Sequence, residues 1–138
     1  MHNIGNTQVD TFTWSYITAL FWTTSENEFP EYCYSGEFGI NEGDALRLTS
    51  ETLTRIIDDC GDFQDKVAAV LGDDAAAQIN AEQAGHDFAM ERNGCGVGFW
   101  DRDVSVYGDR ARDVMHDIAQ TYNEFELHLD DNGLIYGA

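Results

Sequence analysis

Basic residues, proline and long apolar runs are scarce in this 138-residue sequence, and these shortages exclude several classes of protein. Seven lysine and arginine residues stand against 26 aspartate and glutamate residues, which gives a formal net charge of −19. Proteins that bind a phosphate backbone or an anionic membrane surface need a basic footprint, so direct binding to either is excluded. No apolar run approaches the roughly 18 residues of a membrane-spanning helix. No basic region precedes an apolar stretch at the N-terminus, so no secretory signal is expected.

Cysteine is also sparse, and its spacing argues against disulfides and metal sites. Cys33, Cys60 and Cys95 are an odd set without C-x-x-C spacing, which indicates reduced intracellular thiols. The histidines and cysteines fall at no ligand spacing, so we expect neither a metal nor a cofactor. The 43% hydrophobic and 12% aromatic shares predict one folded domain over residues 1–138, with a core large enough to need no disulfide or metal ion for stability.

The first part of the chain, residues 1–85, is predicted to be mainly helical. Residues 10–22 carry apolar side chains at helical spacing, and Asp10 suits the N-cap position. Residues 24–44 are acidic, aromatic and interrupted by glycines, which predicts a long loop. Loops of this length in compact domains are often functional.

Two further helices are predicted before residue 86. Residues 50–71 show the i, i+3, i+4, i+7 apolar pattern of an amphipathic helix, and Gly72 is placed to end it. A third, alanine-rich helix is predicted to begin at Asp73 or Asp74 and to be closed by Gly85.

The remainder of the chain predicts a ββαββ unit. Residues 86–101 alternate and contain Asn93-Gly94, the strongest short hairpin signal. A helix is expected from residue 109, and residues 124–136 alternate cleanly around a second turn. An antiparallel sheet with a helix packed on one face would follow, and the whole chain would be α+β.

Two segments of this second half follow a recognisable pattern. Residues 84–103 read AGHDFAMERNGCGVGFWDRD, and the chain closes with EFELHLDDNGLIYGA. They resemble a family of small bacteriophage and prophage proteins of unassigned activity, which carry a GHDFW-type start, an RNGxGxGFWDR core and a closing DDGxIY. Ala89 stands where that family has an aromatic residue, and Cys95 where histidine is common, which weakens a catalytic role for Cys95. The resemblance covers less than half of the chain and implies a phage-encoded protein.

One glycine-rich stretch, residues 93–98, looks like a phosphate-binding loop. Such a loop ends at a helix N-terminus, whereas this one runs on within the predicted hairpin, so we interpret its glycines as turn and close-approach residues. A small enzyme that uses His86, Cys95 and Asp101 near this turn stays an alternative.

The acidic residues fall in rows. Four share a stripe of the 50–71 helix opposite its apolar face. Three recur at i, i+4 and i+8 along the helix predicted from residue 109, and two lie on the outward face of the strand predicted from residue 124. Like charges at this spacing destabilise a helix by a few tenths of a kcal/mol. The nine residues are Glu51, Asp58, Asp62, Asp65, Asp109, Asp113, Asp117, Glu124 and Glu126.

Three explanations of the acidity compete. A solvated coat keeps a protein soluble, and adaptation to high salt favours acidic, lysine-poor surfaces rich in aspartate. Mimicry of nucleic acid instead lets carboxylates stand in for phosphates in the basic groove of a nucleic-acid-binding protein. We expect mimicry: a non-enzymatic inhibitor of a host nucleic-acid-handling or defence complex, of anti-restriction or anti-CRISPR type, in the host cytoplasm. A structural or assembly role in a salt-adapted phage is the alternative, and the sequence is compatible with a homodimer.

Overall fold

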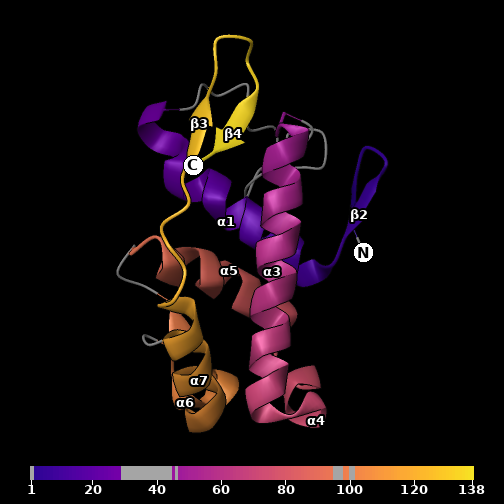
Figure 1. Ribbon diagram of the computed structural model, residues 1–138. Helices are drawn as coiled ribbons and strands as arrows, with labels where there is room; N and C mark the ends of the chain where they lie inside the picture. The colour runs from indigo at the N-terminus through magenta and orange to yellow at the C-terminus, as the bar shows by residue number, and fades with distance from the viewer. Residues whose placement is uncertain (1, 29–44, 46, 95–97, 100–101) are drawn as a thin grey trace.

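The protein is α+β: helices form its body, and two small antiparallel hairpins lie at its periphery (Figure 1). The computed structural model describes residues 2–28, 45, 47–94, 98–99 and 102–138, with the backbone alone at 24–28 and 104. In chain order the elements are β1 (His2–Ile4), β2 (Thr7–Val9), α1 (Thr11–Glu28), α3 (Ser50–Leu71), α4 (Asp73–Ala77), α5 (Ala81–Arg92), α6 (Val104–Tyr107), α7 (Asp109–Ala119), β3 (Leu127–Leu129) and β4 (Ile135–Gly137).

Local capping sets the ends of the first two long helices. The Asp10 carboxylate accepts a hydrogen bond from the Thr13 amide at 2.8 Å at the start of α1. The Thr49 hydroxyl accepts one from the Thr52 amide at 3.2 Å at the start of α3. Gly72 ends α3 with a φ of 91°, a conformation that L side chains rarely adopt. The predicted first and second helices and this stop are confirmed.

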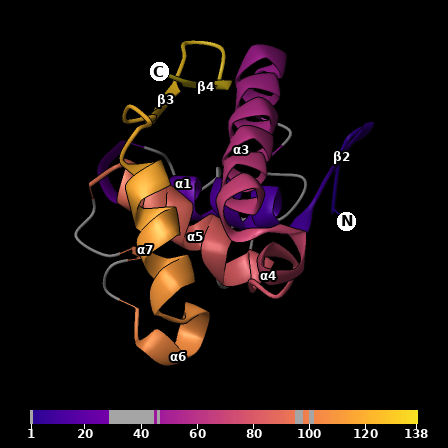
Figure 2. The same cartoon turned by 60° about the horizontal axis from the view of Figure 1, so that its bottom comes forward.

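The core is built on aromatic rings from three helices. Phe63 of α3 stacks on Phe88 of α5 with ring centroids 4.2 Å apart, and Phe12 of α1 lies 5.6 Å from Phe63. All three side chains are at most 3% exposed. Burial of such rings is a dominant stabilising contribution in a small domain. α1 and α5 lie behind the long helix α3, and α7 packs beside it (Figures 1 and 2).

The predicted hairpin over 86–101 is wrong in its first strand, because residues 86–92 form the second half of α5. Residues 95–97 and 100–101 of its second strand lie outside the described residues. Helix α5 is surrounded by other elements, and Ala84, Asp87, Phe88 and Met90 among others are buried around it. A helix buried on most sides lacks the one-sided apolar stripe that reveals a surface helix. The ββαββ arrangement is therefore absent from the part of the chain that the structure describes.

The predicted third helix is split into α4 and α5. Residues 78–80 separate the two, and the Asn80 side chain caps α5 by accepting from the Gln83 amide at 3.0 Å. Gly85 lies inside α5 and does not close a helix. A Cβ atom there would lie 2.1 Å from the Phe12 carbonyl oxygen, so glycine permits the close approach of α1 and α5.

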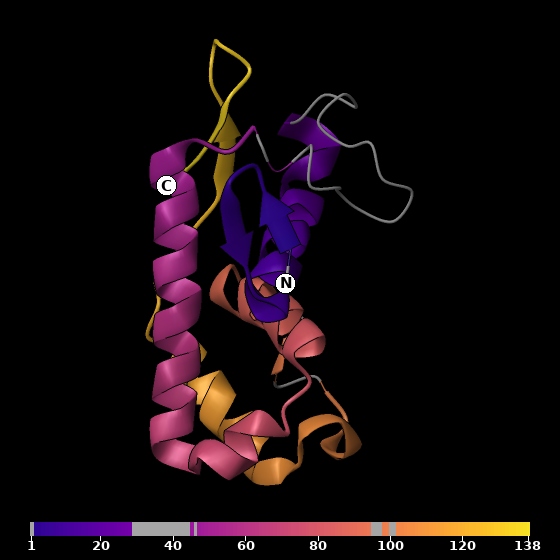
Figure 3. The same cartoon turned by 90° about the vertical axis from the view of Figure 1, so that its right-hand side faces the viewer.

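The predicted C-terminal hairpin is confirmed, with β3 antiparallel to β4 and Leu127 opposite Gly137. Leu48 forms a parallel bridge to Ile135, which joins this hairpin to the chain just before α3. A second hairpin, β1–β2, was not predicted. It lies beside the first turns of α1 (Figure 3). The His2 ring stacks there on Trp14, with the ring centroids 5.1 Å apart.

The predicted helix from residue 109 is confirmed as α7, and the predicted loop over 24–44 is wrong in its first five residues. α1 continues to Glu28, since residues 24–28 contain neither proline nor glycine. Residues 29–44 lie outside the described residues. None of the helices that the structure describes combines the length and apolar character needed to cross a membrane.

Candidate protein-binding surface

All nine carboxylates of the predicted rows are exposed. Those on α3 lie on the side of the helix opposite its buried residues, such as Ile56 and Phe63. Those on α7 lie opposite the buried Met115 and Ala119. We call the nine residues the acidic surface: Glu51, Asp58, Asp62, Asp65, Asp109, Asp113, Asp117, Glu124 and Glu126.

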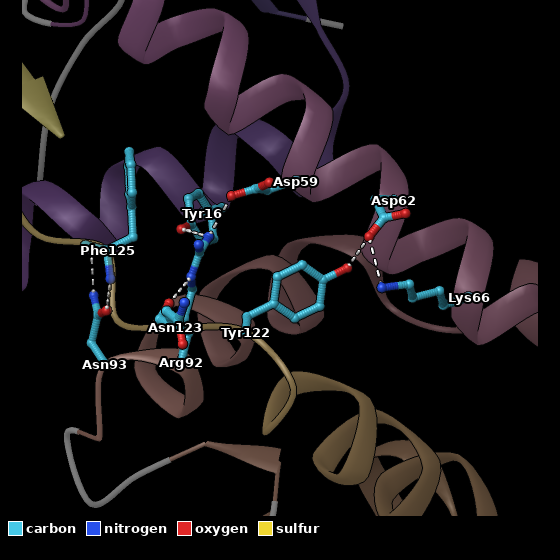
Figure 4. Close-up of polar contacts among 9 residues, drawn as sticks. All are labelled: Tyr16, Asp59, Asp62, Lys66, Arg92, Asn93, Tyr122, Asn123 and Phe125. Atoms are coloured by element: carbon cyan, nitrogen blue, oxygen red, sulfur yellow. Dashed lines mark hydrogen bonds and ion pairs between the residues drawn. The ribbon is translucent and has the colours of Figure 1, made fainter. Parts of the chain in front are cut away.

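Tyr122 connects the row on α3 to the end of α7. It follows α7 in the chain, and its hydroxyl donates a hydrogen bond to Asp62 (Figure 4). Lys66 Nζ lies 3.0 Å from the same carboxylate and 4.9 Å from the Tyr122 ring centroid. The hydrogen bonds from Tyr122 and Lys66 lower the pKa of Asp62. Burial and the bond to Asp62 raise the pKa of Tyr122, so the proton stays on the phenol.

Three of the nine carboxylates have a cation beside them. Lys66 pairs with Asp62, and the Arg112 guanidinium lies 3.5 Å from Asp109 and 3.4 Å from Asp113. Exposed pairs of this kind contribute little stability. The other six form no ion pair with any residue that the structure describes: Glu51, Asp58, Asp65, Asp117, Glu124 and Glu126.

A buried arginine fixes the orientation of α3. Arg92 of α5, with a side chain 3% exposed, pairs with Asp59 of α3 at 2.9 Å. It also donates to the Tyr16 hydroxyl at 3.0 Å and to the Asn123 carbonyl at 2.6 Å (Figure 4). Its guanidinium lies 5.1 Å from the Phe125 ring centroid, within reach of a cation–π contact. One side chain therefore holds α1, α3, α5 and the segment before β3 together.

The segment before β3 is held by a second contact from α5. The Asn93 side chain donates to the Phe125 carbonyl at 3.1 Å and accepts from the Phe125 amide at 2.8 Å, as a neighbouring strand would (Figure 4). Asn93 thus ends a helix and pairs with backbone, whereas the sequence predicted it in a hairpin turn. The contact positions Glu124 and Glu126, which flank Phe125 on the acidic surface.

A third polar cluster lies at the other side of α5. Asp87 is fully buried, and Arg102 donates to it with Nη2 at 2.7 Å and Nε at 2.9 Å. The Tyr107 hydroxyl donates to the same carboxylate at 2.6 Å. Burial raises the pKa of Tyr107, so this hydroxyl keeps its proton.

Of the three residues of the enzyme alternative, the structure describes His86 alone. His86 is partly buried in α5, where burial lowers its pKa. It borders a hollow of about 620 Å³ together with Trp22 and Arg102. Cys95 and Asp101 lie outside the described residues. Within the part of the chain that is described, no three His, Cys, Asp or Glu side chains are placed to hold a metal ion.

An apolar pocket was missed by the sequence reasoning. It has a volume of about 420 Å³ and lies where α3, α4 and α5 meet, over Phe12, Phe63 and Met115. Its lining comes from segments far apart in the chain, so no local pattern of residues predicts it.

The chain matches no protein-family model, no curated protein and no solved structure. The acidic surface and the pocket beside it are therefore the features on which a functional hypothesis rests.

Proposed function

We propose that this protein binds the basic groove of a nucleic-acid-handling protein through the acidic surface and thereby keeps nucleic acid out of that groove. The observation that supports the proposal is the set of nine exposed carboxylates on two helices in contact and on the segment after them, six of them without an ion pair among the described residues. Complementary potentials of this kind accelerate association and make it sensitive to salt.

The spacing of the carboxylates suits this role. A helix rises about 1.5 Å per residue, so the members of each row lie roughly 4.5–10 Å apart along the axis. This range overlaps the spacing of phosphates along a nucleic-acid strand. The resemblance of the second half to phage proteins extends the proposal to a phage-encoded inhibitor of host restriction or CRISPR defence, which acts in the host cytoplasm by binding alone.

The like-charged rows of the acidic surface favour recognition over a simple hydration coat. Asp58 and Asp62, and Asp113 and Asp117, are like charges at i, i+4, an arrangement that destabilises a helix by a few tenths of a kcal/mol per pair. Lysine at some of these positions would remove the repulsion and keep the surface solvated. Retention of the acids is what a surface selected for a basic partner requires.

Charge reversal tests the proposal. The variant Glu51→Lys/Asp58→Lys/Asp65→Lys changes three unpaired members of the acidic surface and leaves Asp62 with its partner Tyr122. Tagged wild-type protein is expected to capture a nucleic-acid-binding protein from bacterial lysate at low salt. Duplex DNA added in excess should displace it, because both compete for the same groove. The variant is expected to lose the capture and to keep the wild-type circular dichroism spectrum.

The matched control changes the net charge equally at exposed acids elsewhere on the molecule, in the variant Asp74→Lys/Glu82→Lys/Asp131→Lys. It is expected to retain capture. If both variants lose capture to the same extent, bulk charge and not the acidic surface is responsible. Capture that excess DNA leaves intact would refute mimicry of nucleic acid.

A further inference from the structure

The apolar pocket opens next to the acidic surface, and its floor belongs to the core. Phe12, Phe63 and Met115 form this floor, and each is at most 3% exposed. The rings of Phe12 and Phe63 lie 5.6 Å apart. Ala76 of α4 and Ala84 of α5 line the pocket with small side chains, which leave room above the rings. A cavity of about 150 Å³ already binds benzene, so a pocket of about 420 Å³ has room for an aromatic side chain.

The polar groups that line the pocket offer acceptors and no free donor. Gln64 Nε2 already donates to Asp10 and to the Cys60 carbonyl, both at 3.2 Å, which leaves the amide oxygen of Gln64 for a ligand. Asp65 and Asp73 are exposed and form no ion pair with a described residue. No basic side chain is among the described residues that line the pocket. Its floor therefore suits an apolar group, and its rim suits cations beside that group.

Asp65 belongs both to the rim of the pocket and to the acidic surface. We propose that the pocket receives an aromatic side chain from a basic segment of the protein that the acidic surface binds, with flanking lysine or arginine residues beside Asp65 and Asp73. This inference rests on the proposed function and adds a specificity element to it. Carboxylates alone attract any basic groove, whereas an aromatic anchor in a desolvated pocket selects one partner among them.

Two synthetic peptides of equal charge test the pocket: Ac-KKFKK-NH2 and Ac-KKAKK-NH2. Isothermal titration calorimetry of the full chain at low ionic strength gives the ratio of their affinities. The phenylalanine peptide is expected to bind about tenfold more tightly, because its ring leaves water when it enters the pocket. Equal affinity of the two peptides overturns the inference.

Filling the pocket provides the matched variants. Ala76→Phe places a ring in the pocket and is expected to abolish the preference for the phenylalanine peptide. Ala75→Phe, at an exposed neighbour on α4 that does not line the pocket, is expected to preserve it. Ala68→Phe fills the pocket from α3 and repeats the test if the first variant disturbs α4. A preference that survives both filling variants also overturns the inference.

The same titrations separate this inference from the proposed function. Glu51→Lys/Asp58→Lys lies outside the pocket and is expected to weaken both peptides while their affinity ratio is unchanged. If this variant binds the alanine peptide as tightly as the wild type does, the acidic surface fails as a binding surface. If the wild type binds both peptides with equal affinity and Glu51→Lys/Asp58→Lys weakens both, the pocket is not a binding site and the acidic surface is supported.

Discussion

Carboxylates that contact the core of the protein form ion pairs with arginine, whereas most carboxylates on the outer face of α3 form none. The fully buried Asp87 lies 2.7 Å from Arg102, and the buried Arg92 lies 2.9 Å from the partly exposed Asp59. Glu51, Asp58 and Asp65 form no ion pair with a described residue. Inside, an isolated charge is costly because it has lost its water, so pairing is kept there. Outside, water and salt screen the charges, and pairing is largely absent. The comparison teaches that the unpaired carboxylates on the outer face of α3 contribute little to folding.

The largest expected effect comes from removing the cation that pairs with a buried carboxylate. Arg102→Met leaves the Asp87 carboxylate buried without its ion pair, and the free energy of unfolding is expected to fall by about 3 kcal/mol. Urea titration followed by circular dichroism measures the change. Lys66→Met is the control, since it removes the pair between Lys66 and Asp62, whose side chains are 50% and 53% exposed, and its cost is expected to stay below about 1 kcal/mol. Equal losses in the two variants would erase the contrast between interior and surface.

Substitution of two helical glycines by alanine is expected to change the free energy of unfolding by an intermediate amount, with opposite signs at the two positions. Gly85→Ala drives a Cβ against the Phe12 carbonyl oxygen and is expected to lower the free energy of unfolding by about 1–3 kcal/mol. Gly61 of α3 has open space around it, so Gly61→Ala is expected to raise stability by about 0.5–1 kcal/mol. Thermal unfolding of both variants checks the signs. A neutral Gly85→Ala would show that α1 and α5 have room to separate.

The smallest expected effect belongs to Asp62 of the acidic surface, whose pKa is lowered by its hydrogen bonds to Tyr122 and Lys66. A lowered pKa means that the contribution is present above the ordinary value of 3.8 and is lost as the pH falls through the folded-state value. Tyr122→Phe removes the main cause. The stability difference between wild type and variant is therefore expected to shrink between pH 5 and pH 2, as acid titration with urea would reveal. A difference that is constant over this range would contradict the coupling.

The elements that could be predicted from the sequence are those buried on one side. α3 and α7 show the apolar period of a helix with one solvent-exposed face. Apolar and polar residues alternate over 124–136 because one side of the hairpin covers the core. The same amphipathic pattern predicts that all nine carboxylates lie at the surface, and their exposure is confirmed. Their role in binding stays a prediction.

The elements that could not be predicted depend on tertiary contacts. α5 is covered on most sides, so it has no one-sided apolar period. Its buried residues Asp87 and Arg92 look like surface residues in the sequence because their ion-pair partners are distant in the chain. The partners of Arg92 lie 76, 33 and 31 positions away in the chain, at Tyr16, Asp59 and Asn123. The pocket likewise needs residues from several helices. Neither periodicity nor spacing contains this information.

The first turn of α3 is fastened by the last strand of the fold. The Thr52 hydroxyl accepts a hydrogen bond from the Gly137 amide at 3.0 Å, and the Thr49 amide donates to the Ile135 carbonyl at 2.9 Å. A ribosome releases residues 50–71 long before residues 135–137, so a nascent chain carries the acidic helix without its fastening. Under the proposed function, a basic partner therefore meets α3 in its final geometry only on chains whose synthesis has passed β4.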